Sequence, residues 1–254
     1  MIDYDTELQF HNGRLRRAYQ INAADQVLDV GCGTGQTTRE AARLASGGVV
    51  TGVDVDEEMI ARARKIASAE GIQNVRFEVG DVGRHLFRAG EFDVAISRFG
   101  TMFFADPETS FRNIAHAIRP EGRLVMMVWQ SYDRNEWAGE IDRALGREAA
   151  RPMATATMNP FSLAEPPTVQ RLLTGAGFDS ITLTDVEVPV YYGRDVDAAF
   201  AFVSQFAAVD EALQGSEARS SSVGARLLST LAAHTSAEGV VFNSRSWIVR
   251  ARRR

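Results

Sequence analysis

The sequence is short of cysteine, histidine and excess positive charge, and each shortage excludes a class of protein. Cys32 is the single cysteine among 254 residues, so no disulfide framework can form within the chain. The four histidines are scattered, and none stands with other ligand types at the spacing of a metal site. The formal net charge is −5, whereas a nucleic-acid-binding domain usually presents a basic face. We therefore expect no metal and no nucleic-acid partner.

Long apolar runs and targeting signals are also missing. No uninterrupted apolar run approaches the roughly 20 residues that a membrane span needs. Residues 1–5 lack the basic start and apolar centre of a signal peptide. We expect a soluble, cytoplasmic protein that does not associate with membranes. The basic residues that close the chain are expected to form a solvated end, and they are Arg250, Arg252, Arg253 and Arg254.

The stretch around which the sequence is organised is a glycine-rich turn between a strand and a helix. Residues 27–30 form a short apolar segment, glycine follows at every second position from 31 to 35, and residues 36–44 have helical spacing. Glycine permits positive φ and lets backbone N–H groups touch a ligand. The nicotinamide fingerprint G-x-G-x-x-G would need glycine at 36, where the chain has Gln36.

Further apolar strands follow at regular intervals, and two of them end in a carboxylate. They are predicted at residues 49–54, 75–81 and 92–97, and a turn followed by one more strand is predicted at residues 119–129, with helices between the strands. Asp54 closes the first of these, where an acid can accept hydrogen bonds from both ribose hydroxyls of an adenosine. Asp81 closes the second and is placed to accept a hydrogen bond from an adenine amino group. The pattern indicates an α/β nucleotide-binding fold.

With this loop and these strands, residues 25–130 resemble the class I S-adenosylmethionine-dependent methyltransferases, and most closely the ubiquinone/menaquinone-biosynthesis type. The resemblance implies S-adenosylmethionine as cofactor and a Rossmann-like fold. That fold has a seven-stranded, mostly parallel sheet with helices on both faces, an N-terminal cover and a helical insertion before the last strand. The predicted cofactor-binding residues are Gly31, Gly33, Thr34, Gly35, Asp54, Val55, Asp81, Val82 and Ser97.

The loop after residue 97 is rich in aromatic side chains, which either line an apolar acceptor pocket or pack under the next helix. Arg98 interrupts the Ser-Phe-Gly order that is common in the resembling family. It could hold an anionic substrate group or pair with a helix carboxylate. The predicted substrate-pocket residues are Arg98, Phe99, Phe103, Phe104, Trp129 and Trp137.

The reaction expected from this resemblance is a direct displacement that moves a methyl group to an O, C or N atom of a small, partly apolar metabolite. No catalytic base can be named, and the candidates are His11, His234 and Tyr19. Two alternatives are an RNA or protein methyltransferase, and a cofactor-binding protein of this fold that transfers no methyl group.

The predicted organisation has four parts. Residues 1–25 form a helical segment that either covers the cofactor or caps the sheet edge, and residues 26–188 form the cofactor-binding core. Residues 189–238 form a helical insertion, which is either a lid over the acceptor or the face of a homodimer. Residues 239–254 carry the last strand of the core and the basic tail.

Overall fold

The computed structural model describes residues 3–147, 159–213 and 221–254, and the chain divides into two compact units. We call them the core unit and the accessory unit. The core unit consists of Arg14–Gln130, Pro160–Val186 and Ser246–Arg254. The accessory unit consists of Met1–Gly13, Ser131–Asn159 and Glu187–Arg245. Each unit is therefore assembled from segments that are distant in the sequence.

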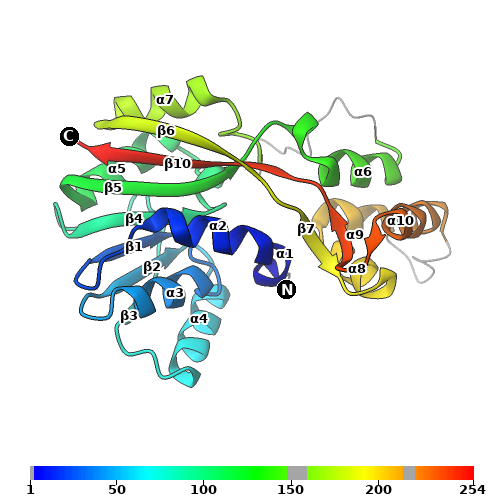
Figure 1. Cartoon of the computed structure of the whole chain (residues 1–254), viewed down its shortest axis with the longest axis horizontal. Coiled ribbons are helices and arrows are strands. Elements are labelled where there is room, and N and C mark those ends of the chain that lie inside the picture. The colour runs from blue at the N-terminus through cyan, green and yellow to red at the C-terminus, as the bar shows by residue number, and fades with distance from the viewer. Residues whose placement is uncertain (1–2, 148–158, 214–220) are drawn as a thin grey trace. The chain divides into compact units, whose positions relative to one another are not determined.

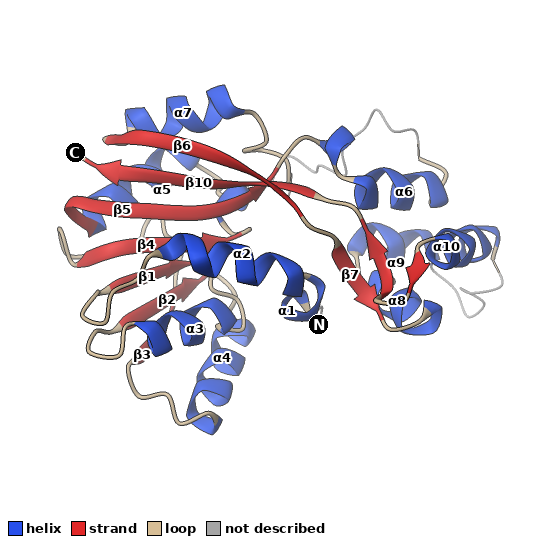
Figure 2. Cartoon of the chain, in the orientation of Figure 1, coloured by secondary structure: helices blue, strands red, loops and turns tan. Residues whose placement is uncertain are grey.

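The core unit is built on a seven-stranded sheet of order β3-β2-β1-β4-β5-β10-β6. Strands β3, β2, β1, β4 and β5 pair in parallel, and β10 pairs antiparallel to β5. Figures 1 and 2 show these strands side by side with helices packed along them. The strands are β1 Val27–Val30, β2 Val50–Asp54, β3 Val75–Val79, β4 Phe92–Arg98, β5 Ile118–Trp129, β6 Phe178–Glu187 and β10 Arg245–Arg253. The predicted Rossmann-like, mostly parallel sheet is confirmed.

Two helices of the core unit, α4 and α5, begin at an aspartate whose side chain caps the helix. Asp56 accepts hydrogen bonds from the N–H groups of Glu58 and Met59 at the start of α4. Asp106 caps α5 through the Thr109 N–H, and Pro107 follows at the first helical position. These caps satisfy backbone donors that a helix leaves unpaired. The helices are α2 Gln9–Tyr19, which crosses the boundary between the units, α3 Gln36–Leu44, α4 Glu57–Ala69, α5 Pro107–Ala117 and α7 Pro166–Gly175.

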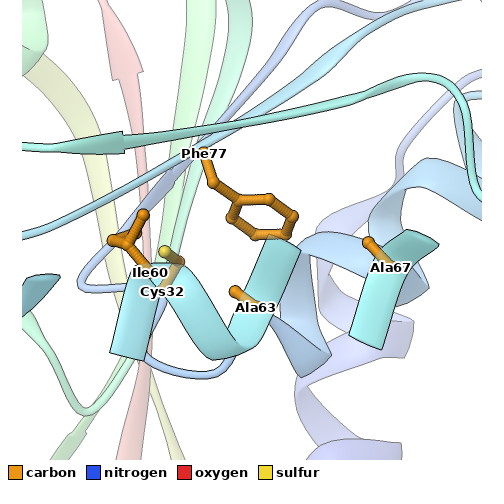
Figure 3. Close-up of a cluster of buried hydrophobic side chains, with 5 residues drawn as sticks. All are labelled: Cys32, Ile60, Ala63, Ala67 and Phe77. Carbon is orange, nitrogen blue, oxygen red and sulfur yellow. The ribbon is translucent and has the colours of Figure 1, made fainter. Parts of the chain in front are cut away.

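A buried cluster packs the glycine turn against α4 and β3, and Figure 3 shows it. Its members are Cys32, Ile60, Ala63, Ala67 and Phe77. Burial raises the pKa of the Cys32 thiol far above its usual value, so the side chain stays neutral and serves for packing. A Cβ on Gly35 would lie 2.6 Å from the Phe77 ring, and its φ is +76°. Glycine is therefore required here by both space and backbone conformation.

The accessory unit contains a three-stranded sheet of order β7-β9-β8, whose pairs are antiparallel. The ring of Tyr192 on β7 packs against Phe202, Phe206 and Phe242 to form an aromatic centre. The elements of this unit are α1 Tyr4–Glu7, α6 Glu136–Ala144, β7 Val190–Gly193, α8 Val196–Val203, α9 Ala207–Leu213, α10 Ser222–Ala233, β8 Thr235–Ser236 and β9 Gly239–Phe242.

The segment predicted as the last strand, residues 239–254, forms two strands that belong to different sheets. β9 pairs with β7 and β8, whereas β10 runs beside β5 from Ser246 to Arg252. The prediction that the terminal arginines form a solvated end is therefore wrong for the backbone, which is part of the central sheet as far as Arg253. Their side chains extend from a strand whose alternate residues, Val249 and Ala251, are buried.

The spacing of apolar residues predicts an amphipathic helix from Glu136 to residue 150. In the structure α6 ends at Ala144, and residues 148–150 lie outside the described part of the chain. In that described part, none of the helices has the length and apolar character to cross a bilayer.

Candidate cofactor site

The glycine turn is tied to the end of the neighbouring strand β2. The N–H groups of Gly31 and Cys32 donate to the Val53 carbonyl at 2.9 and 3.2 Å. The Gly33 N–H donates to Asp54 Oδ2 at 2.8 Å, and Asp54 Oδ1 accepts from the Asp56 N–H at 3.0 Å. Asp54 therefore positions the loop as well as presenting a carboxylate at the carboxyl edge of the sheet, where ligands of open α/β sheets bind.

The turn has one crowded side and one open side. A Cβ on Gly31 would lie 2.9 Å from the Gly100 Cα, so the two backbones touch. A Cβ on Gly33 would meet no atom within 4 Å. The φ angles of Gly31 and Gly33 are +67° and +54°, in the region that favours glycine. The backbone of Gly33 therefore faces open space on the side where a cofactor would lie.

Asp29 on β1 is a buried carboxylate that is not one of the predicted cofactor-binding residues. Its Oδ2 accepts hydrogen bonds from the Thr37 and Thr38 hydroxyls at 2.6 Å each. Its Oδ1 is buried and has no hydrogen-bond partner among the described residues. Burial raises the pKa of Asp29 to about 6, while the two threonine hydroxyls and Arg98 act to lower it. The signal in the sequence was an acid inside the apolar run Val27–Val30.

The predicted adenine contacts lie on the loop after β3. Asp81 is exposed, and its Oδ1 accepts from the Gly83 N–H at 2.8 Å. Val82 is buried, and its carbonyl accepts from the Asn113 amide at 2.6 Å. An open depression borders them, lined by Gly80, Asp81, Arg84, His85 and Leu86. This geometry leaves Asp81 accessible, and its contact with adenine stays a prediction.

The other predicted contacts differ in how far a ligand could reach them. Val55 is 70% exposed, next to Asp54. The Thr34 carbonyl accepts from Arg39 Nη1 at 2.6 Å. Ser97 is fully buried, and its hydroxyl donates to the Val30 carbonyl at 2.7 Å. Ser97 therefore links the ends of β4 and β1, and a contact of its hydroxyl with a cofactor would require that bond to break.

The side chains of the aromatic loop differ in burial and in what they pack against, and their part in an acceptor pocket stays a prediction. Phe99 stacks on Trp129 with ring centroids 3.9 Å apart, and both side chains are buried at the ends of β4 and β5. Phe99 has φ +56°, a strained conformation for an aromatic residue. Phe104 packs edge-on against Phe111 of α5, 5.4 Å away, as the alternative of packing under the next helix predicted. Phe103 is 39% exposed.

The structure gives the burial or the neighbouring groups of each candidate for a catalytic base, and of Trp137. Tyr19 is buried in the core unit, and burial, with a contribution from Asp29, raises its pKa well above the usual value. In the accessory unit His11 Nε2 lies 3.1 Å from the Ser244 hydroxyl. His234 Nδ1 lies 2.8 Å from the Thr230 carbonyl, and its ring stacks on Phe242. Trp137, also in the accessory unit, donates to Asn135 Oδ1 at 3.1 Å. The roles of all four stay predictions.

Comparison with known proteins identifies the family. A sequence model described as a methyltransferase domain matches residues 21–155, which is more than half of the chain. The chain belongs to the methyltransferase-domain family. It is a class I, S-adenosylmethionine-dependent member that resembles the ubiquinone/menaquinone-biosynthesis type.

The chain is similar to curated methyltransferases over part of its length. Nocamycin O-methyltransferase of Saccharothrix syringae is 31% identical over 163 residues, which cover 60% of this chain and 58% of the relative. The ubiquinone/menaquinone biosynthesis C-methyltransferase UbiE of Bdellovibrio bacteriovorus is 33% identical over 105 residues, covering 41% and 44%. The chain thus spans less than two thirds of the length of each.

A solved structure extends the likeness to the whole fold. The YcgJ protein from Bacillus subtilis has a TM-score of 0.67 at 18% identity, and the alignment covers 97% of this chain and 99% of that one. At this identity the likeness establishes the fold alone.

The residues present in the methyltransferase fit the cofactor of its family. The N-terminus of α3 follows the glycine turn, its N-cap is Gly35, and no side chain caps it. The N–H groups at a helix N-terminus suit an anionic ligand group. The open face of Gly33, the carboxylate of Asp54 and the partnerless oxygen of Asp29 lie around the same turn. A nucleoside that carries an amino acid and a positive charge matches these donors and acceptors.

Proposed function

We propose that the protein transfers a methyl group from S-adenosylmethionine to an O, C or N atom of a small, partly apolar metabolite. The observation that carries this proposal is the bond from the Gly33 N–H to Asp54 Oδ2, because it joins the loop for the amino-acid tail to the acid for the ribose. By their names, one of the relatives is an O-methyltransferase for nocamycin and the other is a C-methyltransferase of ubiquinone/menaquinone biosynthesis, which supports a small acceptor.

The residues of this chain would act mainly by binding and orientation. When bound, S-adenosylmethionine supplies an activated methyl group: the carbon–sulfur bond breaks as the bond to the acceptor forms, and the electron pair stays on sulfur. Asp54 and the glycine turn would hold the nucleoside, and the buried charge of Asp29 would favour a positively charged ligand nearby. The Phe99–Trp129 stack would provide an apolar wall that excludes water.

A proton released by the acceptor needs a destination. Tyr19 would not receive it near neutral pH, because a phenol with a raised pKa is already protonated. For a phenolic or acidic acceptor the proton would leave to solvent or to a group on the acceptor itself.

Calorimetry with S-adenosylhomocysteine, followed by turnover of methyl-labelled S-adenosylmethionine with a panel of phenols, carbon acids and amines, tests the proposal. We expect binding of the nucleoside and label transfer to at least one small acceptor. Tight binding of a nicotinamide dinucleotide, with none of S-adenosylhomocysteine, would contradict the cofactor. Cofactor binding with labelling of RNA or protein alone would contradict the acceptor class, and binding without any transfer would contradict the reaction.

A further inference from the structure

Arg98 lies at the end of β4, beside the turn that follows β1. Its Nη1 donates a hydrogen bond to Gln36 Oε1 at 2.6 Å, and Gln36 is the first residue of α3. Arg98 is half-buried, and this bond holds its guanidinium next to the first residue of α3. This bond places the Arg98 guanidinium beside the cofactor turn, at the residue where α3 begins.

Two sources of positive potential meet at this point. One is the guanidinium of Arg98, and the other is the N-terminus of α3, which no side chain caps. Asp29 is buried next to the same turn: its Oδ2 accepts hydrogen bonds from the first-turn residues Thr37 and Thr38, and its buried Oδ1 has no hydrogen-bond partner among the described residues. A positive group near a buried negative one complements a zwitterion, such as the α-amino and α-carboxylate groups of an amino acid.

The strand order places Arg98 at the correct end of the cofactor. Asp81 follows β3, Asp54 ends β2, the glycine turn follows β1 and Arg98 ends β4, in the spatial order β3-β2-β1-β4. These strands are parallel, so all four positions lie at the carboxyl edge. With adenine at β3 and ribose at β2, the amino-acid tail crosses β1 and ends near β4. The two strand spacings from Asp54 to Arg98 amount to about 10 Å, a distance that a methionyl chain can cover.

We propose that Arg98 binds the carboxylate at the end of the amino-acid tail of S-adenosylmethionine, with the guanidinium held in place by Gln36. The inference rests on the proposed function, since it needs the nucleoside in the site. It assigns Arg98 to the cofactor instead of to an anionic group of the acceptor. A planar guanidinium suits this task because it can donate two parallel hydrogen bonds to a carboxylate.

Comparison of three nucleosides measures how much the carboxylate alone contributes to binding. S-adenosylhomocysteine has both tail charges, its decarboxylated analogue keeps only the ammonium, and 5′-methylthioadenosine has neither. Calorimetry would compare the wild type, Arg98→Gln, Arg98→Lys and the control Arg88→Gln. Arg88 is an exposed arginine on the loop before β4, so its replacement changes the net charge equally.

In the wild type and Arg88→Gln we expect S-adenosylhomocysteine to bind about 10–100-fold more tightly than its decarboxylated analogue, the range of a charge-assisted hydrogen bond. Arg98→Gln should lose that preference, with the affinity for the other two nucleosides changed by less than about threefold. Arg98→Lys should keep part of it, because the charge remains without the planar geometry. Thermal unfolding of each variant checks that the fold is intact.

If Arg98→Gln and Arg98→Lys lower the affinity for all three nucleosides equally, the inference is overturned, because the result would show a structural role for the arginine. Unchanged affinity for S-adenosylhomocysteine would also overturn it and would return Arg98 to the acceptor. If the wild type binds none of the nucleosides, the proposed function fails first and the inference fails with it.

Discussion

Single residues of the cofactor site do more than one task. Asp54, chosen from the sequence for a ribose, also accepts a hydrogen bond from the Gly33 N–H. Ser97, which the sequence predicts as a cofactor contact, donates its hydroxyl hydrogen to the Val30 carbonyl. Asp29, which was not chosen, has the raised pKa and the partnerless oxygen. A residue type at a motif position thus predicts where a side chain lies better than which bonds it makes.

Replacement of Asp54 tests the first of these residues. Asp54→Ala should weaken S-adenosylhomocysteine binding by on the order of 1–3 kcal/mol, because charge-assisted hydrogen bonds to the ribose are lost. Asp54→Asn keeps one acceptor oxygen and should fall between the wild type and the alanine variant in titration calorimetry. Affinity equal to that of the wild type in Asp54→Ala would show that the ribose lies elsewhere.

The titration of Asp29 makes a prediction about stability and pH. Its pKa is raised from 3.8 to about 6 in the folded protein, so between these values the folded state binds more protons than the unfolded state. Its contribution to the free energy of unfolding should therefore fall as pH rises from about 4 to about 6, by up to about 3 kcal/mol, and then level off.

Urea unfolding of the wild type and Asp29→Asn across pH 4 to 7.5 measures that change. The asparagine variant does not titrate at this position, so the wild type should lose stability relative to it as pH rises. A constant difference between the two proteins over this range would contradict the raised pKa.

At the scale of elements, the turn between β1 and α3 is determined by its glycines and by what packs beneath them. Gly35 faces Phe77 and Ala63, while Gly33 faces open space. The sequence predicted the turn as a unit, because alternating glycines after an apolar strand have few other uses. It could not separate the glycine needed for packing from the one needed for a ligand, since that depends on Phe77, a residue of another strand.

The two glycines should respond differently to alanine. Gly35→Ala places a Cβ 2.6 Å from the Phe77 ring at φ +76° and should lower the free energy of unfolding by about 1–3 kcal/mol. Gly33→Ala meets no neighbour and should cost less stability, about 1 kcal/mol for its positive φ. Gly33→Ala should nevertheless reduce the affinity for S-adenosylhomocysteine at least as much as Gly35→Ala does. Chemical unfolding and calorimetry on both variants would reveal the contrast, and a larger loss of stability in Gly33→Ala would contradict it.

At the scale of the whole molecule, the chain end completes the core. β10 is paired with β5 over Ser246–Arg252, although a strand so close to four arginines was predicted to end in a solvated tail. Charged residues on alternate positions are compatible with a strand when the positions between them are buried. Arg252 pairs with Glu121 on the neighbouring strand, so part of the basic tail has a partner of opposite charge.

Replacement of a buried residue of β10 tests its part in the fold. Val249 has no exposed surface, so Val249→Asp would bury an unpaired charge and should lower the free energy of unfolding by on the order of 3–5 kcal/mol. Arg250→Ala, at the adjacent exposed position, should change it by less than about 0.5 kcal/mol. Similar melting temperatures for the two variants would show that this strand contributes little to the core.

The sequence by itself determined the order of elements from residue 27 to 129, the glycine turn, the two carboxylates at strand ends and hence the family. Those features are local: a turn, a cap or a strand end is set by residues close together in the chain. Tertiary structure alone decided the split of the last strand, the burial of Asp29 and the place of Arg98 beside Gln36. Each of these depends on a partner that lies many residues away, and the spacing of residues along one segment carries no information about that partner.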